Sequence, residues 1–179
     1  MIDFSVILAG FGGQGILSAG KMAAEAALFE GKEVSWFPSY GPEMRGGTAN
    51  CSVVISDEPI GSPVINDADV VICLNQPSME KFESQIKPGG ILIIDSSLIH
   101  IQPTRTDIKF IAMPASDIAS ELGNMQFATI SMLGCLSAAT SCFSRDSFES
   151  SLKEVLPERH HNKIPGNLNA FDKGASYAK

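Results

Sequence analysis

The sequence predicts an α/β domain of three layers, doubly wound, with a mostly parallel sheet and an antiparallel hairpin at one edge. Three observations support this prediction. An apolar segment at residues 4–9 is followed by a glycine-rich turn and then by a helix-forming segment. Two continuous apolar runs, at residues 70–74 and 91–94, are typical of strands whose two faces are both covered. The chain has 179 residues, close to the size of one domain, so we expect a single domain over residues 1–179.

Composition and charge exclude several classes of protein. Apolar residues make up 44% of the chain and charged residues 18%, which argues against a disordered protein. Twenty acidic side chains against thirteen basic ones give a formal charge of −7, which repels nucleic-acid backbones and acidic membranes. We therefore expect no nucleic-acid partner and no membrane partner, and any site for an anion must be local. The N-terminal residues lack a basic stretch followed by a long apolar one, and no apolar run approaches about 18 residues, so we expect a soluble, cytoplasmic chain.

The first elements follow from the N-terminal pattern. Residues 4–9 are rich in β-branched and aromatic side chains and predict a strand. The glycine-rich turn at residues 10–15 follows, and residues 16–30 have helix formers with apolar positions at helical spacing. Residues 32–37 predict the second strand, which we expect to end before Pro38.

An alternating segment and a β-α-β unit come next. Residues 50–56 alternate between apolar and polar side chains, and a turn at residues 56–59 leads to Ile60, which predicts a hairpin. The two buried strands at residues 70–74 and 91–94 are separated by a helix. We expect Asn75 to cap that helix at its start and Pro88-Gly-Gly90 to stop it.

The C-terminal half predicts mostly helices. A further strand is expected at residues 109–113, with helices at residues 116–122 and 126–143. From Asp146 onward we expect one more short helix and a polar, proline-containing stretch.

The first candidate binding motif is the glycine turn between the first strand and its helix. Its backbone N–H groups and the start of the helix can face a phosphate or a carboxylate. The expected site residues are Gly10, Gly12, Gly13, Gln14 and Gly15. NAD is disfavoured because the second strand ends without an acidic residue for the ribose, and no lysine follows the glycines as a P-loop requires. An alternative is that these glycines only allow a helix to pack closely on a strand.

The second candidate motif is the glycine-rich loop after the second strand. It is expected at the same edge of the sheet as the glycine turn. Arg45 can bind a phosphate or carboxylate with its planar guanidinium, and Glu43 can orient it. The expected site residues of this loop are Tyr40, Glu43, Arg45, Gly46 and Gly47. A solvated salt bridge on a surface loop is the alternative.

Catalytic and metal-binding patterns are weak. No G-x-S-x-G motif occurs, and the pair His160-His161 lacks the helical spacing of metal ligands, so we expect it on a solvent or interface surface. Asp95 follows a buried strand and is either a site acid or a loop cap. The cysteines form no CxxC and no zinc or iron–sulfur pattern, and we expect buried free thiols. They are Cys51, Cys73, Cys135 and Cys142.

Several segments taken together resemble the gamma subunit of the 2-oxoacid:ferredoxin oxidoreductases. The resemblance rests first on GFGGQG at residues 10–15, SYGPEMRGG at residues 39–47 and VVISDEPI at residues 53–60. It continues through ADVVICLNQPS at residues 68–78 and GGILIIDSS at residues 89–97. The match covers most of the chain, so the resemblance implies one gamma-type domain over residues 1–179.

The resemblance also implies a function. Enzymes of this family oxidatively decarboxylate a 2-oxoacid, pass electrons to ferredoxin and form an acyl-coenzyme A. Thiamine diphosphate is then expected on the alpha and beta subunits, and [4Fe–4S] clusters on partner subunits such as a ferredoxin-like delta subunit. This chain would bind none of these cofactors alone and would supply no catalytic residue. Its two glycine-rich loops would lie at the coenzyme A side of the active centre or at the alpha subunit.

Two alternatives remain at this point. One is an independent nucleotide- or coenzyme A-binding module that works without partners. The other is a structural adaptor subunit whose loops bind no ligand.

Overall fold

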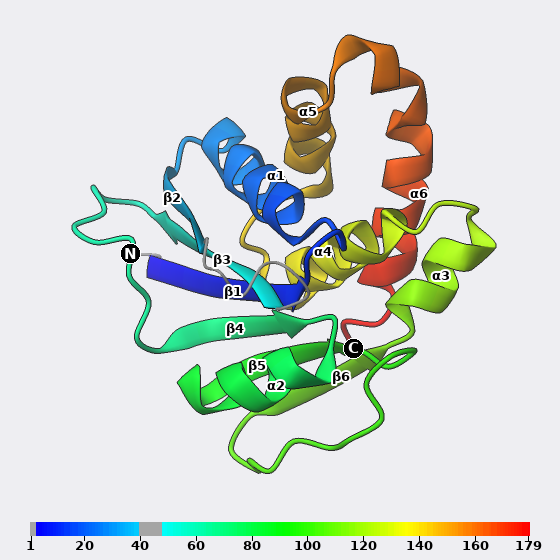
Figure 1. Cartoon of the computed structure of the whole chain (residues 1–179). Coiled ribbons are helices and arrows are strands. Elements are labelled where there is room, and N and C mark those ends of the chain that lie inside the picture. The colour runs from blue at the N-terminus through cyan, green and yellow to red at the C-terminus, as the bar shows by residue number, and fades with distance from the viewer. Residues whose placement is uncertain (1–2, 40–47) are drawn as a thin grey trace.

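Six strands form one sheet with the order β2-β3-β1-β4-β5-β6 (Figure 1). The computed structural model describes residues 3–39 and 48–179. The strands are β1 (Asp3–Phe11), β2 (Glu33–Ser39), β3 (Thr48–Ser56), β4 (Ala68–Cys73), β5 (Ile86–Asp95) and β6 (Lys109–Met113). β1, β4, β5 and β6 are parallel neighbours, and β3 runs antiparallel to both β1 and β2. The predicted fold class, a mostly parallel sheet with an antiparallel pair at one edge, is confirmed.

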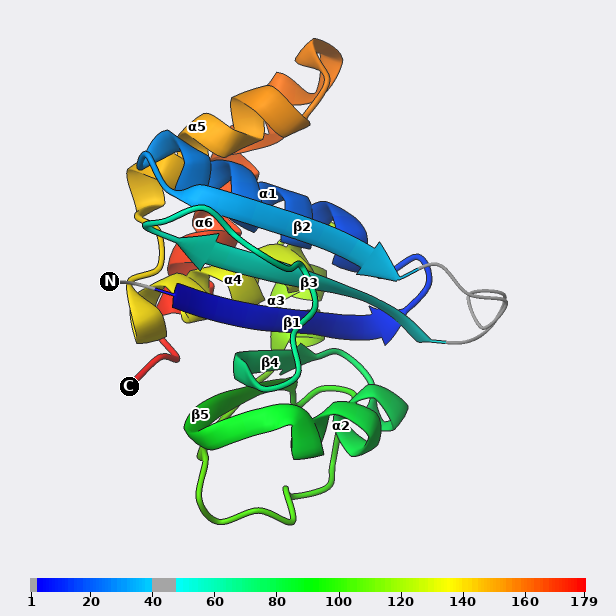
Figure 2. The same cartoon turned by 90° about the vertical axis from the view of Figure 1, so that its left-hand side faces the viewer.

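The helices cover the two faces of the sheet unequally (Figures 1 and 2). One face is covered by α1 (Ile16–Phe29), α3 (Ala115–Glu121), α4 (Phe127–Thr140), α5 (Arg145–Val155) and α6 (Ile164–Ala175). The other face has α2 (Gln76–Phe82), which continues as the 3₁₀ helix η2 (Glu83–Gln85), and the segment at residues 96–108. A second 3₁₀ helix, η3 (Glu158–Lys163), joins α5 to α6.

The strands β4 and β5 lie between two apolar layers. Val70 and Ile72 belong to the core under the five helices, whereas Val71 and Cys73 belong to the core under α2. Burial on both faces explains why the sequence of these strands is continuously apolar rather than alternating. None of the helices in the described residues is both long and apolar enough to cross a membrane.

The hairpin lies one connection earlier than the sequence predicted. β2 and β3 form the antiparallel pair, with Glu33 opposite Ser56 and Ser39 opposite Asn50. The turn at residues 56–59 leads into a loop instead of a strand. Pro38 lies inside β2, which an edge strand tolerates because one side of its backbone needs no partner.

Pro88-Gly-Gly90 does not end the preceding helix but forms a bulge inside β5. The partner of β4 advances from Ile86, opposite Ala68, to Ile91, opposite Val70. Gly89 has a φ of +79°, and a Cβ on Gly90 would lie 2.8 Å from the carbonyl oxygen of Asp69. Glycine is required here because the two backbones approach closely.

The C-terminal tail contains two α-helices, not the single short one expected. α6 lies against α4, and glycines allow the contact: a Cβ on Gly134 would lie 1.9 Å from the carbonyl oxygen of Phe171, and one on Gly174 would lie 1.7 Å from that of Ser131. The second of these helices was not predicted because the sequence of this tail is polar and contains glycines, although one face of the helix is buried. Its buried residues are Ile164, Asn167, Ala170, Phe171 and Gly174.

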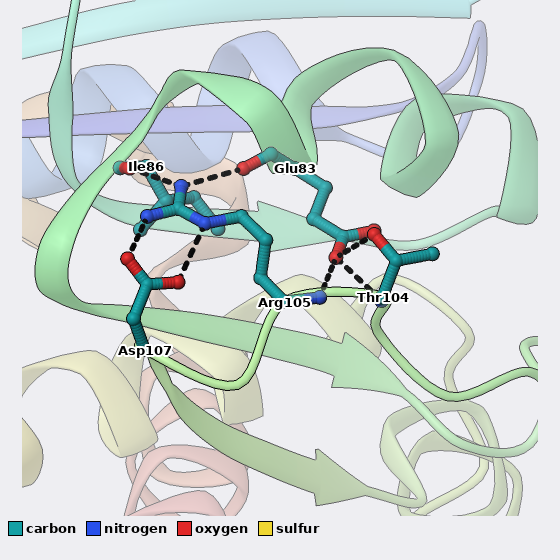
Figure 3. A network of polar contacts seen from close by, with 5 residues as sticks. All are labelled: Glu83, Ile86, Thr104, Arg105 and Asp107. Atoms are coloured by element: carbon teal, nitrogen blue, oxygen red, sulfur yellow. Dashed lines mark hydrogen bonds and ion pairs between the residues drawn. The ribbon is translucent and has the colours of Figure 1, made fainter.

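A polar network holds the segment at residues 96–108 against the second face of the sheet (Figure 3). One carboxylate oxygen of Glu83 accepts hydrogen bonds from the backbone N–H of Thr104 (2.6 Å), the hydroxyl of Thr104 (2.9 Å) and the backbone N–H of Arg105 (2.8 Å). The Arg105 guanidinium donates to the carbonyl oxygens of Glu83 and Ile86 and pairs with both carboxylate oxygens of Asp107. Glu83 is therefore a structural residue, since its acceptor sites serve this segment.

Candidate functional site

The glycine turn connects the end of β1 to the start of α1 at the carboxyl edge of the parallel strands. Gly13 and Gly15 have φ values of +88° and +79°, which L side chains rarely adopt. Gly15 is the N-cap of α1; among the described residues no side chain caps this helix, and no acidic residue lies in its first turn. The first backbone N–H groups of α1 and its positive dipole end are therefore available to an anionic ligand.

The five predicted turn residues have different structural roles. The side-chain oxygen of Gln14 accepts a hydrogen bond from the N–H of Phe11 at 2.6 Å, so this side chain folds back over the turn. A Cβ on Gly10 would lie 2.6 Å from that oxygen and 3.0 Å from the Cδ1 of Ile16. Close packing therefore explains why position 10 is a glycine. It does not explain the glycine at position 13, because a Cβ added to Gly13 would meet nothing within 4 Å.

A pocket of about 350 Å³ opens beside this turn, and we call it the turn pocket. Four parts of the chain line it: the turn with the start of α1, the start of α4, the end of α5, and η3 with the first residues of α6. Its lining includes Gly13, Gly15, Thr129, His160, Lys163 and Asn167. The pocket is large enough for a substantial part of a nucleotide-sized ligand.

The charged groups of the turn pocket are basic. Among the described residues that line it, His160 and Lys163 are the ones with ionisable side chains. Desolvation lowers the pKa of His160 below its ordinary value, and the positive charges of Lys163 and Arg159 lower this pKa further. In a chain with a formal charge of −7, this is the local basic site that an anionic ligand requires.

A solvent or interface surface was predicted for both histidines, and the structure separates them. His160 lines the turn pocket, whereas the Nε2 of His161 lies 2.9 Å from the carbonyl oxygen of Leu156. The available signal was the segment ERHHNK at residues 158–163, which gathers Arg159, both histidines and Lys163 in an acidic chain. Its position beside the glycine turn depends on how α6 packs on α4.

A smaller apolar pocket adjoins the turn on its other side. It measures about 130 Å³ and shares Gly13 and Gln126 with the turn pocket. Leu74, Met125 and Ala128 give it an apolar lining. A ligand seated on Gly13 can therefore contact a basic pocket and an apolar one at the same time.

The second predicted loop lies outside the described residues. Its expected site residues are Tyr40, Glu43, Arg45, Gly46 and Gly47. The two flanking strand ends can be placed: Ser39 pairs with Asn50, Asn50 pairs with Ala9, and Thr48 pairs with Phe11. The loop is therefore joined to the sheet at the edge where β1 leads into the glycine turn.

Asp95 is a structural cap. Its side chain is fully buried, and its oxygens accept hydrogen bonds from the N–H of Ser97 (3.1 Å), the N–H of Ser116 (3.2 Å) and the hydroxyl of Ser116 (2.5 Å). These bonds join the end of β5 to the start of α3. Of the two readings that the sequence left open, the geometry favours the cap.

The cysteines are buried free thiols, as predicted. Within residues 3–39 and 48–179, no three His, Cys, Asp or Glu side chains are grouped as metal ligands would be.

Another cavity, of about 270 Å³, lies at the opposite edge of the sheet. Ser5, Ser56, Asp67 and Lys87 are among its lining residues. Lys87 is paired there with Asp69 at 3.0 Å. Parallel α/β sheets bind ligands at the carboxyl ends of their strands, so the turn pocket is the stronger candidate.

The sequence of residues 5–177 matches the protein family described as pyruvate ferredoxin/flavodoxin oxidoreductase. The chain belongs to this family. The resemblance drawn from the glycine-rich segments is thereby confirmed, and the glycine turn and the turn pocket are features of a member of an oxidoreductase family.

Two relatives in this family differ in length. The chain is 38% identical over 178 residues to the ketoisovalerate oxidoreductase subunit VorA of Methanothermobacter marburgensis, covering 99% of this chain and 37% of that protein. It is 39% identical over 175 residues to the 2-oxoglutarate synthase subunit KorC of Methanocaldococcus jannaschii, covering 96% of this chain and 92% of that protein. The chain thus spans little more than a third of VorA but nearly all of KorC.

Solved structures have the same fold. The gamma subunit of a keto/oxoacid ferredoxin oxidoreductase from Geobacter sulfurreducens superposes with a TM-score of 0.87 at 30% identity, covering 99% of this chain and 97% of that one. The 2-oxoglutarate:ferredoxin oxidoreductase from Magnetococcus marinus, solved with 2-oxoglutarate, coenzyme A and succinyl-CoA bound, superposes with a TM-score of 0.88 at 28% identity. That match covers 99% of this chain and 31% of the other.

Proposed function

We propose that this chain is the gamma-type part of a 2-oxoacid:ferredoxin oxidoreductase that oxidatively decarboxylates a 2-oxoacid to an acyl-CoA with ferredoxin as electron acceptor. The observation that carries the proposal is the uncapped start of α1 at Gly13 and Gly15, which opens into a pocket whose charged lining is basic. Coenzyme A is an anion with three phosphate groups and a pantetheine arm that combines amides with methyl and methylene groups. It fits a turn that lies between a basic pocket and an apolar one.

In this proposal the chain binds and orients coenzyme A and contributes no catalytic base. Thiamine diphosphate on the alpha and beta subunits and [4Fe–4S] clusters on partners such as the delta subunit supply the decarboxylation and the electron transfer when bound. The second loop remains part of the proposal: Tyr40, Glu43, Arg45, Gly46 and Gly47 would contact coenzyme A or the alpha subunit. The names of the relatives support a subunit of a complex over an independent module.

Exposed apolar side chains at the carboxyl edge support the need for partners. Phe11 at the end of β1 is 44% exposed, Leu98 after β5 is 46% exposed and Met125 before α4 is 59% exposed. These three side chains surround the same edge as the glycine turn. A partner subunit that covers them would also enclose the ligand.

The test is an assay of the complex purified with its partner subunits, using a panel of 2-oxoacids that includes 2-oxoglutarate, ketoisovalerate and pyruvate. The panel is needed because VorA and KorC, at 38% and 39% identity, are named for different oxoacids. We expect coenzyme A-dependent reduction of ferredoxin with one class of oxoacid.

The variant Gly13→Ala tests the role of the turn. Gly13 lines the pocket, so the substitution adds a methyl group at the proposed ligand site, and its φ of +88° strains an alanine backbone. We therefore expect the KM for coenzyme A to rise roughly tenfold while the KM for the oxoacid stays unchanged. Gly31→Ala is the matched control, since Gly31 has a similar φ of +76°, an added Cβ meets nothing within 4 Å there, and the residue is not in the lining of the turn pocket. The proposal fails if the chain associates with no partner, or if Gly13→Ala leaves the KM for coenzyme A at the wild-type value.

A further inference from the structure

The 3₁₀ helix η3 presents two basic side chains to the turn pocket from one face. In a 3₁₀ helix, side chains three residues apart lie on the same side, and His160 and Lys163 have this spacing. Both line the pocket, whereas Arg159 and His161 do not. Two of the basic side chains of η3 therefore line the pocket.

Contacts at both ends hold η3 in this orientation. The Nε2 of His161, within η3, lies 2.9 Å from the carbonyl oxygen of Leu156, which precedes the helix. At its end, the side-chain Nδ2 of Asn167 donates to the carbonyl oxygen of Lys163 at 2.8 Å, and Asn167 is only 7% exposed. The backbone that supports the two basic side chains is thus tied to α6.

None of the described residues that line the pocket carries a carboxylate. The described lining residues contributed by α1, α4, α5 and α6 are uncharged, and Lys163 and Arg159 are the neighbours that shift the titration of His160. The Lys163 ammonium group, the His160 imidazole and the start of α1 therefore meet in one cavity. None of the described lining residues supplies an anion to this group, and a phosphate group can supply it.

We propose that His160 and Lys163 bind the phosphate groups of coenzyme A, and that His160 takes up a proton when they bind. This inference rests on the proposed function and assigns the phosphate contacts to residues outside both glycine-rich loops. The lowered pKa of His160 favours the neutral form of that side chain in the free protein. A bound phosphate raises the pKa of His160 because the opposite charge favours the protonated form. Affinity for coenzyme A therefore rises as the pH falls from 8 towards the pKa of the free His160.

The test is isothermal titration calorimetry of coenzyme A with the assembled complex in buffers of different ionisation enthalpy, between pH 6.5 and 8. We expect proton uptake with the wild-type chain and its loss with His160→Gln. We expect Lys163→Gln to weaken binding roughly tenfold, as the loss of a charge-assisted contact implies. Lys153→Gln removes the same charge from α5 outside the pocket, and His100→Gln removes an exposed histidine elsewhere. Both controls should bind as the wild type does.

The outcomes separate this inference from the proposed function. If the complex binds coenzyme A, and His160→Gln and Lys163→Gln bind it with wild-type affinity and wild-type proton uptake, the inference is overturned while the proposed function stands. If the wild-type complex binds no coenzyme A, the proposed function fails as well. Thermal unfolding of each variant identifies any loss of binding that comes from misfolding, and Lys163→Arg, which keeps the charge, should restore most of the affinity.

Discussion

At the scale of single residues, the cysteines show what burial does to a reactive group. Burial raises the pKa of Cys51 to about 12 and those of Cys135 and Cys142 to about 11, and it raises the pKa of Cys73 as well. The thiolate is the reactive form, and at pH 8 these thiols remain protonated and covered. We therefore expect the native chain to react with less than one equivalent of Ellman's reagent in minutes, and with four equivalents after unfolding in guanidinium chloride. Fast reaction of the native chain would contradict this burial.

For the turn glycines, the sequence predicted the location of the turn but not the separate role of each residue. The turn at residues 10–15 was predicted from its position between a strand and a helix, and the structure places it there. The separate roles within it were not predictable, because the packing of Gly10 against the Gln14 side chain depends on how that side chain folds back. The basic pocket lining was missed for a similar reason. His160 and Lys163 are far from the turn in sequence, and a tertiary contact brings them to it.

At the scale of elements, the contact between α4 and α6 positions one wall of the turn pocket. Gly174→Ala places a methyl group where the carbonyl oxygen of Ser131 lies, 1.7 Å from the ideal Cβ. We expect the free energy of unfolding to fall by about 3 kcal/mol, although the same change on an exposed helix surface would stabilise by up to about 1 kcal/mol. Urea denaturation measures the difference, and Gly61→Ala should change the value by less than about 0.5 kcal/mol. A Gly174→Ala protein as stable as the wild type would show that the two helices are not in this contact.

Some helices and strands could be predicted from the sequence and others could not. β4 and β5 were predicted because burial on both faces leaves a continuous apolar run. The extent of β5 was wrong because proline and glycine, which commonly end an element, form a bulge inside it. α6 was missed because the glycines that let it approach α4 also lower its helix propensity. In both cases a tertiary contact outweighed the local preference of the sequence.

At the scale of the whole molecule, the features that bear on function lie at one edge of the sheet. The glycine turn, the turn pocket, the apolar pocket and the exposed side chains of Phe11, Leu98 and Met125 all lie where the parallel strands end. The opposite edge has a polar cavity with the Lys87–Asp69 ion pair. The chain spans 37% of the length of the VorA subunit to which it is similar.

Hydrogen–deuterium exchange of the assembled complex, with and without coenzyme A, tests the central claim most directly. If the start of α1 and η3 hold the ligand, amides at residues 13–18 and 158–163 will exchange more slowly when coenzyme A is bound. Amides of β6 and of the cavity lined by Ser5 and Lys87 serve as the internal reference and will exchange at the same rate in both states. Coenzyme A binding that leaves both segments at their unliganded rates would contradict the account.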